Sequence, residues 1–106
     1  MQSIPLGKIT VPSAGTPVPI TLTAAQAAQL PPSGLVCKVE AYPDPAATGT
    51  VYVKQGGVTL AALPKATNVV QPWSTGERDR NVINQLAYQI DAATNTDGCF
   101  VTLWVE

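Results

Sequence analysis

The side chains that most often carry acid–base chemistry are scarce in this chain of 106 residues. It contains no histidine, and carboxylates such as Glu40, Asp44 and Asp91 fall in separate predicted elements, so no spacing argues for a paired general acid and base. The serines lack a neighbouring base, and Gly56-Gly57 is not followed by the lysine and helix of a phosphate-binding loop. We therefore expect that the protein is not an enzyme and has no catalytic residue, cofactor or small-molecule substrate.

Metal binding is equally poorly supported. Asp91 and Asp97 flank the oxygen-rich residues 92–96, but their spacing does not match a calcium loop, and a hydrogen-bonded hairpin is the better interpretation. Cys37 and Cys99 lack the histidines or further cysteines that a zinc site needs. No export signal is visible at the N-terminus, which favours two buried thiols, although the sequence leaves the pairing of these cysteines open.

Glu77-Arg78-Asp79-Arg80 is the only dense run of charges, and it is electrically neutral. Arg78 and Arg80 suit carboxylates on another protein, while the alternative is a solvated loop. The other cations are scattered without a basic stripe, so we expect no nucleic-acid partner. No apolar run is long enough to cross a bilayer, so we expect no membrane partner either.

The composition favours a binding protein. Charged residues make up 12% of the chain, against roughly 25% in an average domain, while 45% are hydrophobic. A chain of this length buries only about 60–65% of its unfolded surface, so its core is thin and a partner would help to cover it. Trp73 and Trp104, like the tyrosines, could line a sugar-binding face, but they are more often anchors of a core or an interface.

The elements that would position these residues are β-strands. Ten prolines and eight glycines separate short runs of Val, Ile, Thr and Tyr, which predicts an all-β fold, a small antiparallel β-sandwich or jelly-roll-like barrel. Gln55-Gly56-Gly57 predicts a hairpin turn, and Thr23 with Gln26 predicts a capped, short helical insert over 23–30. The expected strands span 6–12, 17–23, 35–42, 50–54, 58–63, 67–73, 86–90 and 99–105.

The last of these strands is apolar on both sides. Phe100 and Trp104 alternate with Cys99, Val101, Leu103 and Val105. Such a strand is typical of a position covered on one side by the core and on the other by something else.

The N-terminal residues 1–19 are expected to be an extended arm or an edge strand, ahead of a β-sandwich domain over 20–106. Four prolines fix φ and remove backbone donors, which excludes a helix. The segment is nevertheless too apolar for a tail in water, with Ile4, Leu6, Ile9 and Val11. An arm of this kind could add a strand to a neighbouring subunit, while the alternative is an edge strand of its own domain.

Residues 46–53, Ala-Ala-Thr-Gly-Thr-Val-Tyr-Val, followed by Gly56-Gly57-Val58, resemble the "NTG-x-VYVG" hairpin of small β-proteins encoded beside the capsid genes of tailed phages. The opening residues 9–18 and the ending over 86–103 follow the same layout. The chain departs from that pattern at Lys54, where the pattern has Gly, at the helical insert over 24–30 and at residues 77–81.

This resemblance implies a structural virion protein, a capsid decoration (cement) subunit that is made in the host cytoplasm and lies on the capsid exterior. Its partners would be the major capsid protein and copies of itself, as a trimer or dimer. The alternatives are a tail or head–tail connector component and a carbohydrate-binding or adhesion module. The residues expected at a partner interface are Ile4, Leu6, Ile9, Val11, Trp73, Arg78, Arg80 and Trp104.

Overall fold

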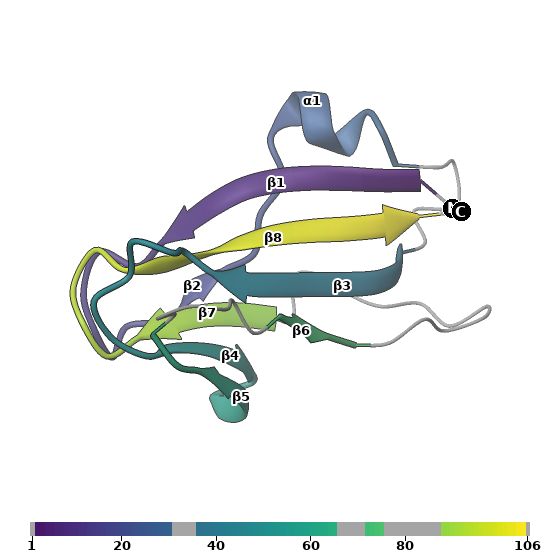
Figure 1. Ribbon diagram of the computed structural model, residues 1–106. Helices are drawn as coiled ribbons and strands as arrows, with labels where there is room; N and C mark the ends of the chain where they lie inside the picture. The colour runs from purple at the N-terminus through teal and green to yellow at the C-terminus, as the bar shows by residue number, and fades with distance from the viewer. Residues whose placement is uncertain (1, 31–35, 66–71, 76–87, 106) are drawn as a thin grey trace.

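Alternation of apolar and polar residues arranges the described chain in two antiparallel four-stranded sheets (Figure 1). The computed structural model describes residues 2–30, 36–65, 72–75 and 88–105. The first sheet has the order β1 (Gln2–Thr10), β8 (Gly98–Val105), β3 (Val36–Pro43) and β6 (Trp73–Ser74). The second has the order β2 (Val18–Pro19), β7 (Tyr88–Ala92), β4 (Val51–Gln55) and β5 (Val58–Leu63). The prediction of a small all-β sandwich is confirmed.

The strand pairs are nested within one another along the chain. β1 pairs with β8, β2 with β7, β3 with β6 and β4 with β5, each in antiparallel fashion. The chain is thus one long hairpin that is rolled up so that its pairs alternate between two sheets, which is the strand order of a jelly roll. Gln2 consequently lies opposite Val105, and the two ends of the described chain meet (Figure 1).

The core lies between the inner faces of the sheets. In β3 and β8 every second side chain is buried, as half-buried strands require. Leu22 and Leu30, on either side of the helix, pack against this core. The large side chains that are fully buried are Ile4, Val11, Ile20, Val36, Val39, Pro43, Val51, Val53, Ile90, Val101, Leu103 and Val105.

The short helical insert and the hairpin turn were both predictable from local chemistry. Thr23 caps α1 (Ala24–Ala27), and its side chain and that of Gln26 form the reciprocal hydrogen bonds of a capping box. The helix ends earlier than the expected residue 30, in turns of the 3₁₀ type. Gly56 and Gly57 both have positive φ, as a tight hairpin turn between β4 and β5 requires.

No helix among the described residues has the length and apolarity to span a membrane.

The N-terminal segment is an edge strand of its own sheet. Residues 2–10 pair with β8 along the whole length of both strands, and a bulge between Pro5 and Gly7 interrupts this pairing. Ile4 and Val11 are fully buried in the core, and Leu6 and Ile9 pack against it. This corrects the expectation that Ile4 and Val11 contact a partner, because neither side chain has exposed surface. Leu6 and Ile9 are half-buried, so a partner contact at these two residues stays a prediction.

Two further expectations are refined. The expected strand over 17–23 is reduced to β2, because Pro17 and Pro19 remove the backbone donors that a longer ladder needs. The expected strand over 67–73 lies largely outside the described residues, and β6 begins at its last residue, Trp73.

The two cysteines are buried thiols, as predicted, and no disulfide joins them. Cys99 lies opposite Pro43, whereas Cys37 adjoins Val36 at the other end of β3, about 20 Å away at the rise of a strand. Burial raises the pKa of the Cys99 thiol to about 12.

Candidate functional site

The outer face of the first sheet carries three aromatic side chains among its polar ones. Along β8 the residues that alternate with the buried ones are Phe100, Thr102 and Trp104, all half-buried. On the neighbouring β3 the corresponding positions are Lys38, Glu40 and Tyr42. We call Lys38, Tyr42, Phe100 and Trp104 the aromatic face.

Strand register brings the first aromatic pair together. Tyr42 lies directly opposite Phe100, so their side chains emerge on the same side of adjacent strands. The ring centroids are 5.8 Å apart and the ring planes differ by 20°, a stacked geometry. One face of each ring is therefore covered by the other ring, while the pair as a whole remains on the outside of the sheet.

Trp104 and Lys38 form the second pair of the aromatic face. They are opposite one another in the same register, and the Nζ atom of Lys38 lies 5.0 Å from the centroid of the indole ring. Lys38 also lies 3.6 Å from a carboxylate oxygen of Glu40. The indole Nε1–H is buried and has no hydrogen-bond partner among the described residues. A buried indole N–H usually has one, so this N–H is an uncompensated polar group within the sheet.

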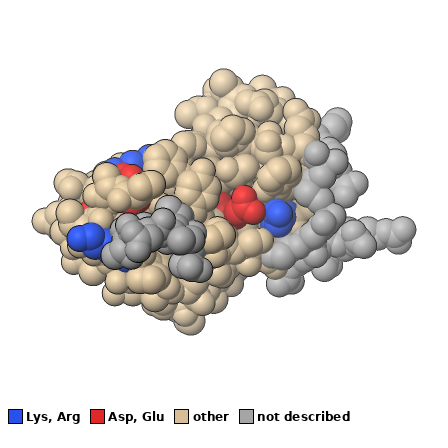
Figure 2. All heavy atoms as spheres, in the orientation of Figure 1, with Lys and Arg blue, Asp and Glu red and all other residues tan. Residues whose placement is uncertain are grey.

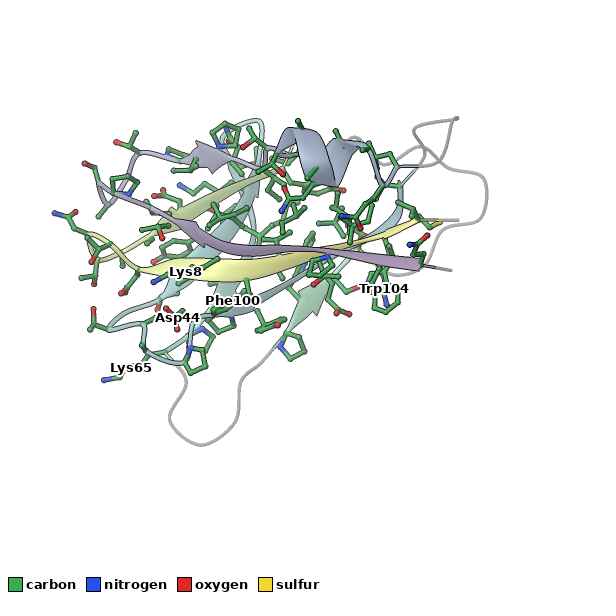
Figure 3. All side chains as sticks on the ribbon, turned by 90° about the horizontal axis from the view of Figure 1, so that it is seen from above. Lys8, Asp44, Lys65, Phe100 and Trp104 are labelled. Carbon is green, nitrogen blue, oxygen red and sulfur yellow. The ribbon has the colours of Figure 1, made fainter. Side chains whose placement is uncertain are left out.

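An ion pair borders the aromatic face. The Nζ atom of Lys8 lies 2.7 Å from Asp44 Oδ2, joining β1 to the loop after β3 beside Phe100 (Figure 3). The hydrogen bond from Lys8, aided by the backbone N–H of Ala46, holds the pKa of Asp44 below its usual value. The charge at this border is thus neutralised within the chain. Figure 3 shows Trp104 farther along β8, towards the chain ends.

The charges on and around the aromatic face are paired with one another. Figure 2 shows a mainly uncharged surface, with acidic and basic side chains in a few small groups. Among the described residues the ion pairs are Lys8–Asp44, Lys38–Glu40 and Lys54–Asp91, so most of this charge is compensated locally.

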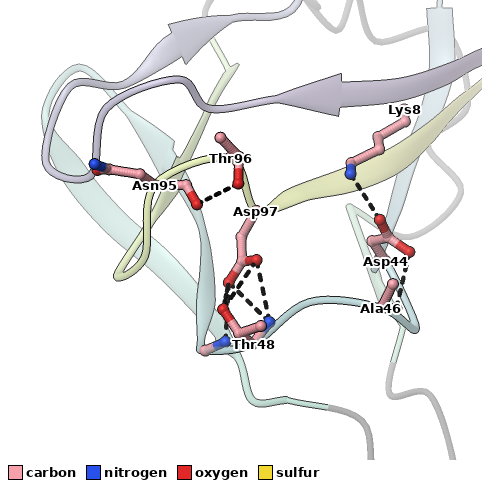
Figure 4. A network of polar contacts seen from close by, with 8 residues as sticks. Lys8, Asp44, Ala46, Thr48, Asn95, Thr96 and Asp97 are labelled. Atoms are coloured by element: carbon pink, nitrogen blue, oxygen red, sulfur yellow. Dashed lines mark hydrogen bonds and ion pairs between the residues drawn. The ribbon is translucent and has the colours of Figure 1, made fainter.

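One end of the sandwich is organised by carboxylates. Three loops meet there, residues 11–17, 44–50 and 93–97, and we call this region the carboxylate end. Asp97 is buried and accepts hydrogen bonds from the backbone N–H groups of Thr48 and Gly49, at 3.1 and 2.9 Å, and from the Thr48 hydroxyl (Figure 4). It thereby fastens the loop before β4 to the loop that crosses from β7 in the second sheet to β8 in the first.

Asp91 fastens the third loop. Its carboxylate accepts hydrogen bonds from Lys54 Nζ at 2.7 Å and from the backbone N–H groups of Gly15 and Ala92. Burial alone would raise the pKa of Asp91, but these hydrogen bonds outweigh burial, so the pKa lies below its usual value. An ionised, fully bonded carboxylate is a structural group and a poor general acid.

The carboxylate end does not assemble a metal site. Asp91 and Asp97, which flank the 92–96 loop, direct their oxygens to different protein donors. The hairpin interpretation of this loop is wrong, because β7 and β8 belong to different sheets and the loop crosses from one to the other. Within the described ranges no cluster of three or more His, Cys, Asp or Glu side chains could hold a metal ion.

The expected interface residues separate into three groups. Trp104 lies on the aromatic face, while Trp73 lies at the sheet edge, with its ring centroid 5.8 Å from that of Tyr88 on β7. Arg78 and Arg80 lie outside the described residues. Ile4, Leu6, Ile9 and Val11 belong to the core or its border. The expected interface residues did not include Tyr42, Phe100 and Lys38, although the alternation over 35–42 and 99–105 already assigned them to one side of each strand.

Comparisons with models of protein families, with curated proteins and with solved structures found no match to this chain.

Proposed function

We propose that the protein is a structural virion component, a capsid decoration (cement) subunit of a tailed phage that attaches to the assembled head through its aromatic face. The observation that supports attachment is the placement of three aromatic side chains on the outside of a sheet. One-sided antiparallel sheets normally present polar residues to water. An aromatic outer face therefore favours a second protein surface lying on this sheet.

The chemistry of the aromatic face suits a flat protein interface. Interface cores are enriched in Tyr, Trp and Phe and depleted in charge. Trp104 and the Tyr42–Phe100 pair would supply most of the binding energy, as a few large side chains do in most interfaces, with the polar residues Glu40 and Thr102 between them. The compensated pair Lys8–Asp44 would lie at the polar rim, where a charge costs little to keep hydrated.

The partner and location follow from the resemblance of residues 46–58 to the phage hairpin. We propose the major capsid protein as the partner, the capsid exterior as the location and the host cytoplasm as the place of synthesis. A tail or head–tail connector component would use the same face. Jelly rolls occur both in viral capsids and in lectins, so the fold alone does not choose between these functions.

Carbohydrate binding is the second candidate, and the row of aromatic rings is the observation that favours it. A sugar ring stacks on an open aromatic face. Here Tyr42 and Phe100 cover one face of each other, and Lys38 lies over one face of Trp104. This loss of open ring surface makes protein attachment the better-supported proposal.

The test is co-sedimentation with phage shells. The purified chain is mixed with shells assembled from the major capsid protein that is encoded beside it, and the bound fraction is measured over a range of concentrations. We expect saturable binding that weakens at least about tenfold in Trp104→Ala and in Phe100→Ala. Tyr52→Ala is the matched control, because Tyr52 is a half-buried aromatic residue on the outer side of the second sheet.

The results that would overturn the proposal are equally clear. Absence of binding to the shells would exclude the decoration role. An equal loss in Tyr52→Ala would show that the aromatic face is not the contact. Specific capture on a glycan array, lost in Trp104→Ala, would establish the carbohydrate-binding alternative instead.

A further inference from the structure

Each sheet has two edge strands, and three of these four edges carry features that discourage pairing with another chain. An edge strand presents unpaired backbone N–H and C=O groups, which prolines, charges, bulges and short length protect. β1 contains Pro5, Lys8 and a bulge. β2 has two residues, one of them Pro19, and β6 has two residues directly after Pro72.

The fourth edge, β5, lacks most of this protection. It is six residues long, Val58-Thr59-Leu60-Ala61-Ala62-Leu63, and contains neither a proline nor a charged residue. Its inner edge pairs with β4, and no described strand pairs with its outer edge. A bulge at Leu60 interrupts the pairing with β4 but adds no charge to the outer edge.

A second observation falls on the same strand. Among the described residues the large hydrophobic side chains that are exposed are Val58, at 63%, and Leu60, at 44%. An open backbone edge and exposed apolar side chains therefore coincide in β5. The backbone groups require an extended strand as their partner, and the side chains require an apolar one.

We infer that the outer edge of β5 pairs in antiparallel fashion with the same edge of a second copy of this chain. A two-fold axis brings identical patches together, so a strand that binds its own kind must not repel itself. β5 meets this condition because it has no charged residue, so no register of the two copies places like charges opposite one another. The first charge after it, Lys65, would lie at opposite ends of the paired strands, since these run in opposite directions.

The absence of charge also makes a charged strand of another protein a poorer partner than a second copy of β5, because β5 has no side chain that could compensate the foreign charge. Pairing would join the second sheets of two copies into one continuous sheet and cover Val58 and Leu60. A contact built on one strand is smaller than the roughly 800 Å² per partner of a standard interface. We therefore expect a reversible dimer with a dissociation constant on the order of micromolar. This inference is independent of the capsid proposal.

The experiment is sedimentation equilibrium of the full chain from about 1 to about 300 μM, which brackets the expected dissociation constant. The test variant is the double substitution Val58→Lys with Leu60→Lys, which places like charges across the two-fold axis. We expect its dissociation constant to rise at least about tenfold. The matched control is Ser3→Lys with Thr10→Lys, which adds the same charge at exposed positions of edge strand β1 and should leave the dimer unchanged.

Hydrogen exchange of the unmodified chain provides a second readout that does not depend on the folding of any variant. Amides in residues 56–63 should become more protected as concentration rises, while those of β1 should not. The inference would be overturned if sedimentation showed a monomer at every concentration, or a dimer equally strong in the lysine variant. It would also be overturned if the concentration-dependent protection were confined to the aromatic face.

Discussion

The aromatic face and the carboxylate end both lie at the surface, yet they use their polar groups in opposite ways. At the carboxylate end Asp91 and Asp97 are almost fully buried and accept hydrogen bonds from several donors on other loops. On the aromatic face the indole N–H of Trp104 lacks a partner among the described residues, and the rings remain half-buried. The first region is complete within the chain, whereas the second leaves aromatic ring surface that a partner could cover.

This difference separates stability from binding. A buried carboxylate with all its donors holds loops together, and its removal leaves those donors unsatisfied. A half-buried ring on the outside of a sheet contributes little to folding but can contribute much to an interface. Substitutions at the carboxylate end should therefore change the free energy of unfolding, and substitutions on the aromatic face should change affinity.

The largest effect on stability is expected for Gly98→Ala, where the carboxylate end meets β1. A Cβ atom there would lie 2.2 Å from the backbone carbonyl oxygen of Ile9, which cannot move without separating β1 from β8. We expect the free energy of unfolding to fall by about 3 kcal/mol or more, measured by urea denaturation. Gly49→Ala is the matched control, because the one close approach of its Cβ would be to the Thr94 hydroxyl, which can rotate away, while its other contacts are at ordinary distances. Equal losses in both variants would contradict this explanation.

Asp97→Ala should have the next largest effect. It leaves the N–H groups of Thr48 and Gly49 without their acceptor, for an expected loss of about 1–3 kcal/mol in urea denaturation. Asp97→Asn retains one carbonyl acceptor and should lose about half as much. Shell binding per folded molecule should be unchanged, and a specific loss of binding would break the separation between the two regions.

Acid should weaken the carboxylate end at a defined pH. The folded-state pKa values of Asp44 and Asp91 lie below the ordinary value of 3.8. Their contribution to stability is therefore fully present above that value and is lost as the pH falls through the lower folded-state values. We expect the urea midpoint to decline below about pH 4 and the decline to be shallower in Asp91→Asn. A decline that begins near pH 6 would indicate another group.

Trp104→Ala should cost the fold less, about 1–2 kcal/mol, through lost contact with Lys38 and the sheet. Shell affinity should nevertheless fall at least about tenfold. Urea denaturation and co-sedimentation of the same preparation measure the two quantities together. A large loss of stability with unchanged affinity would reverse the assignment of the two regions.

The smallest effect is expected from reductant. Cys37 and Cys99 are buried thiols at opposite ends of β3 and β8, so dithiothreitol should leave the thermal midpoint unchanged. Because burial raises the pKa of Cys99 to about 12, this thiol should resist alkylation at neutral pH until the chain unfolds. Rapid alkylation of Cys99 in the native protein would show that the neighbouring carboxylate end opens readily.

Features set by short stretches of sequence were predictable. Thr23 and Gln26 are three residues apart and cap a helix by themselves, and Gly56-Gly57 supplies both positive φ angles of a tight turn. The alternation in 99–105 likewise assigned Phe100 and Trp104 to one side of a strand. In each case the controlling interactions lie within a few residues.

Features set by strand neighbours were not predictable. The stacking of Tyr42 on Phe100 requires that β3 lies beside β8 in one particular register, and the hydrogen bonds from Thr48 and Gly49 to Asp97 join loops far apart in the chain. The apolar pattern of Ile4, Leu6 and Ile9 fits the core of the chain's own sandwich as well as a groove on another protein. Only the observed pairing with β8 distinguishes these two possibilities.

The nested strand pairs also determine the order in which the chain can fold. β4 and β5 are joined by a two-residue turn and close at little entropic cost, whereas each pair outside them must close a longer loop. β1 and β8 form the outermost pair, so the first strand to be synthesised must wait for the last. On the ribosome the apolar side chains of β1 therefore remain without their native cover until the C-terminal strand has emerged, and this interval is when the chain is most exposed to aggregation.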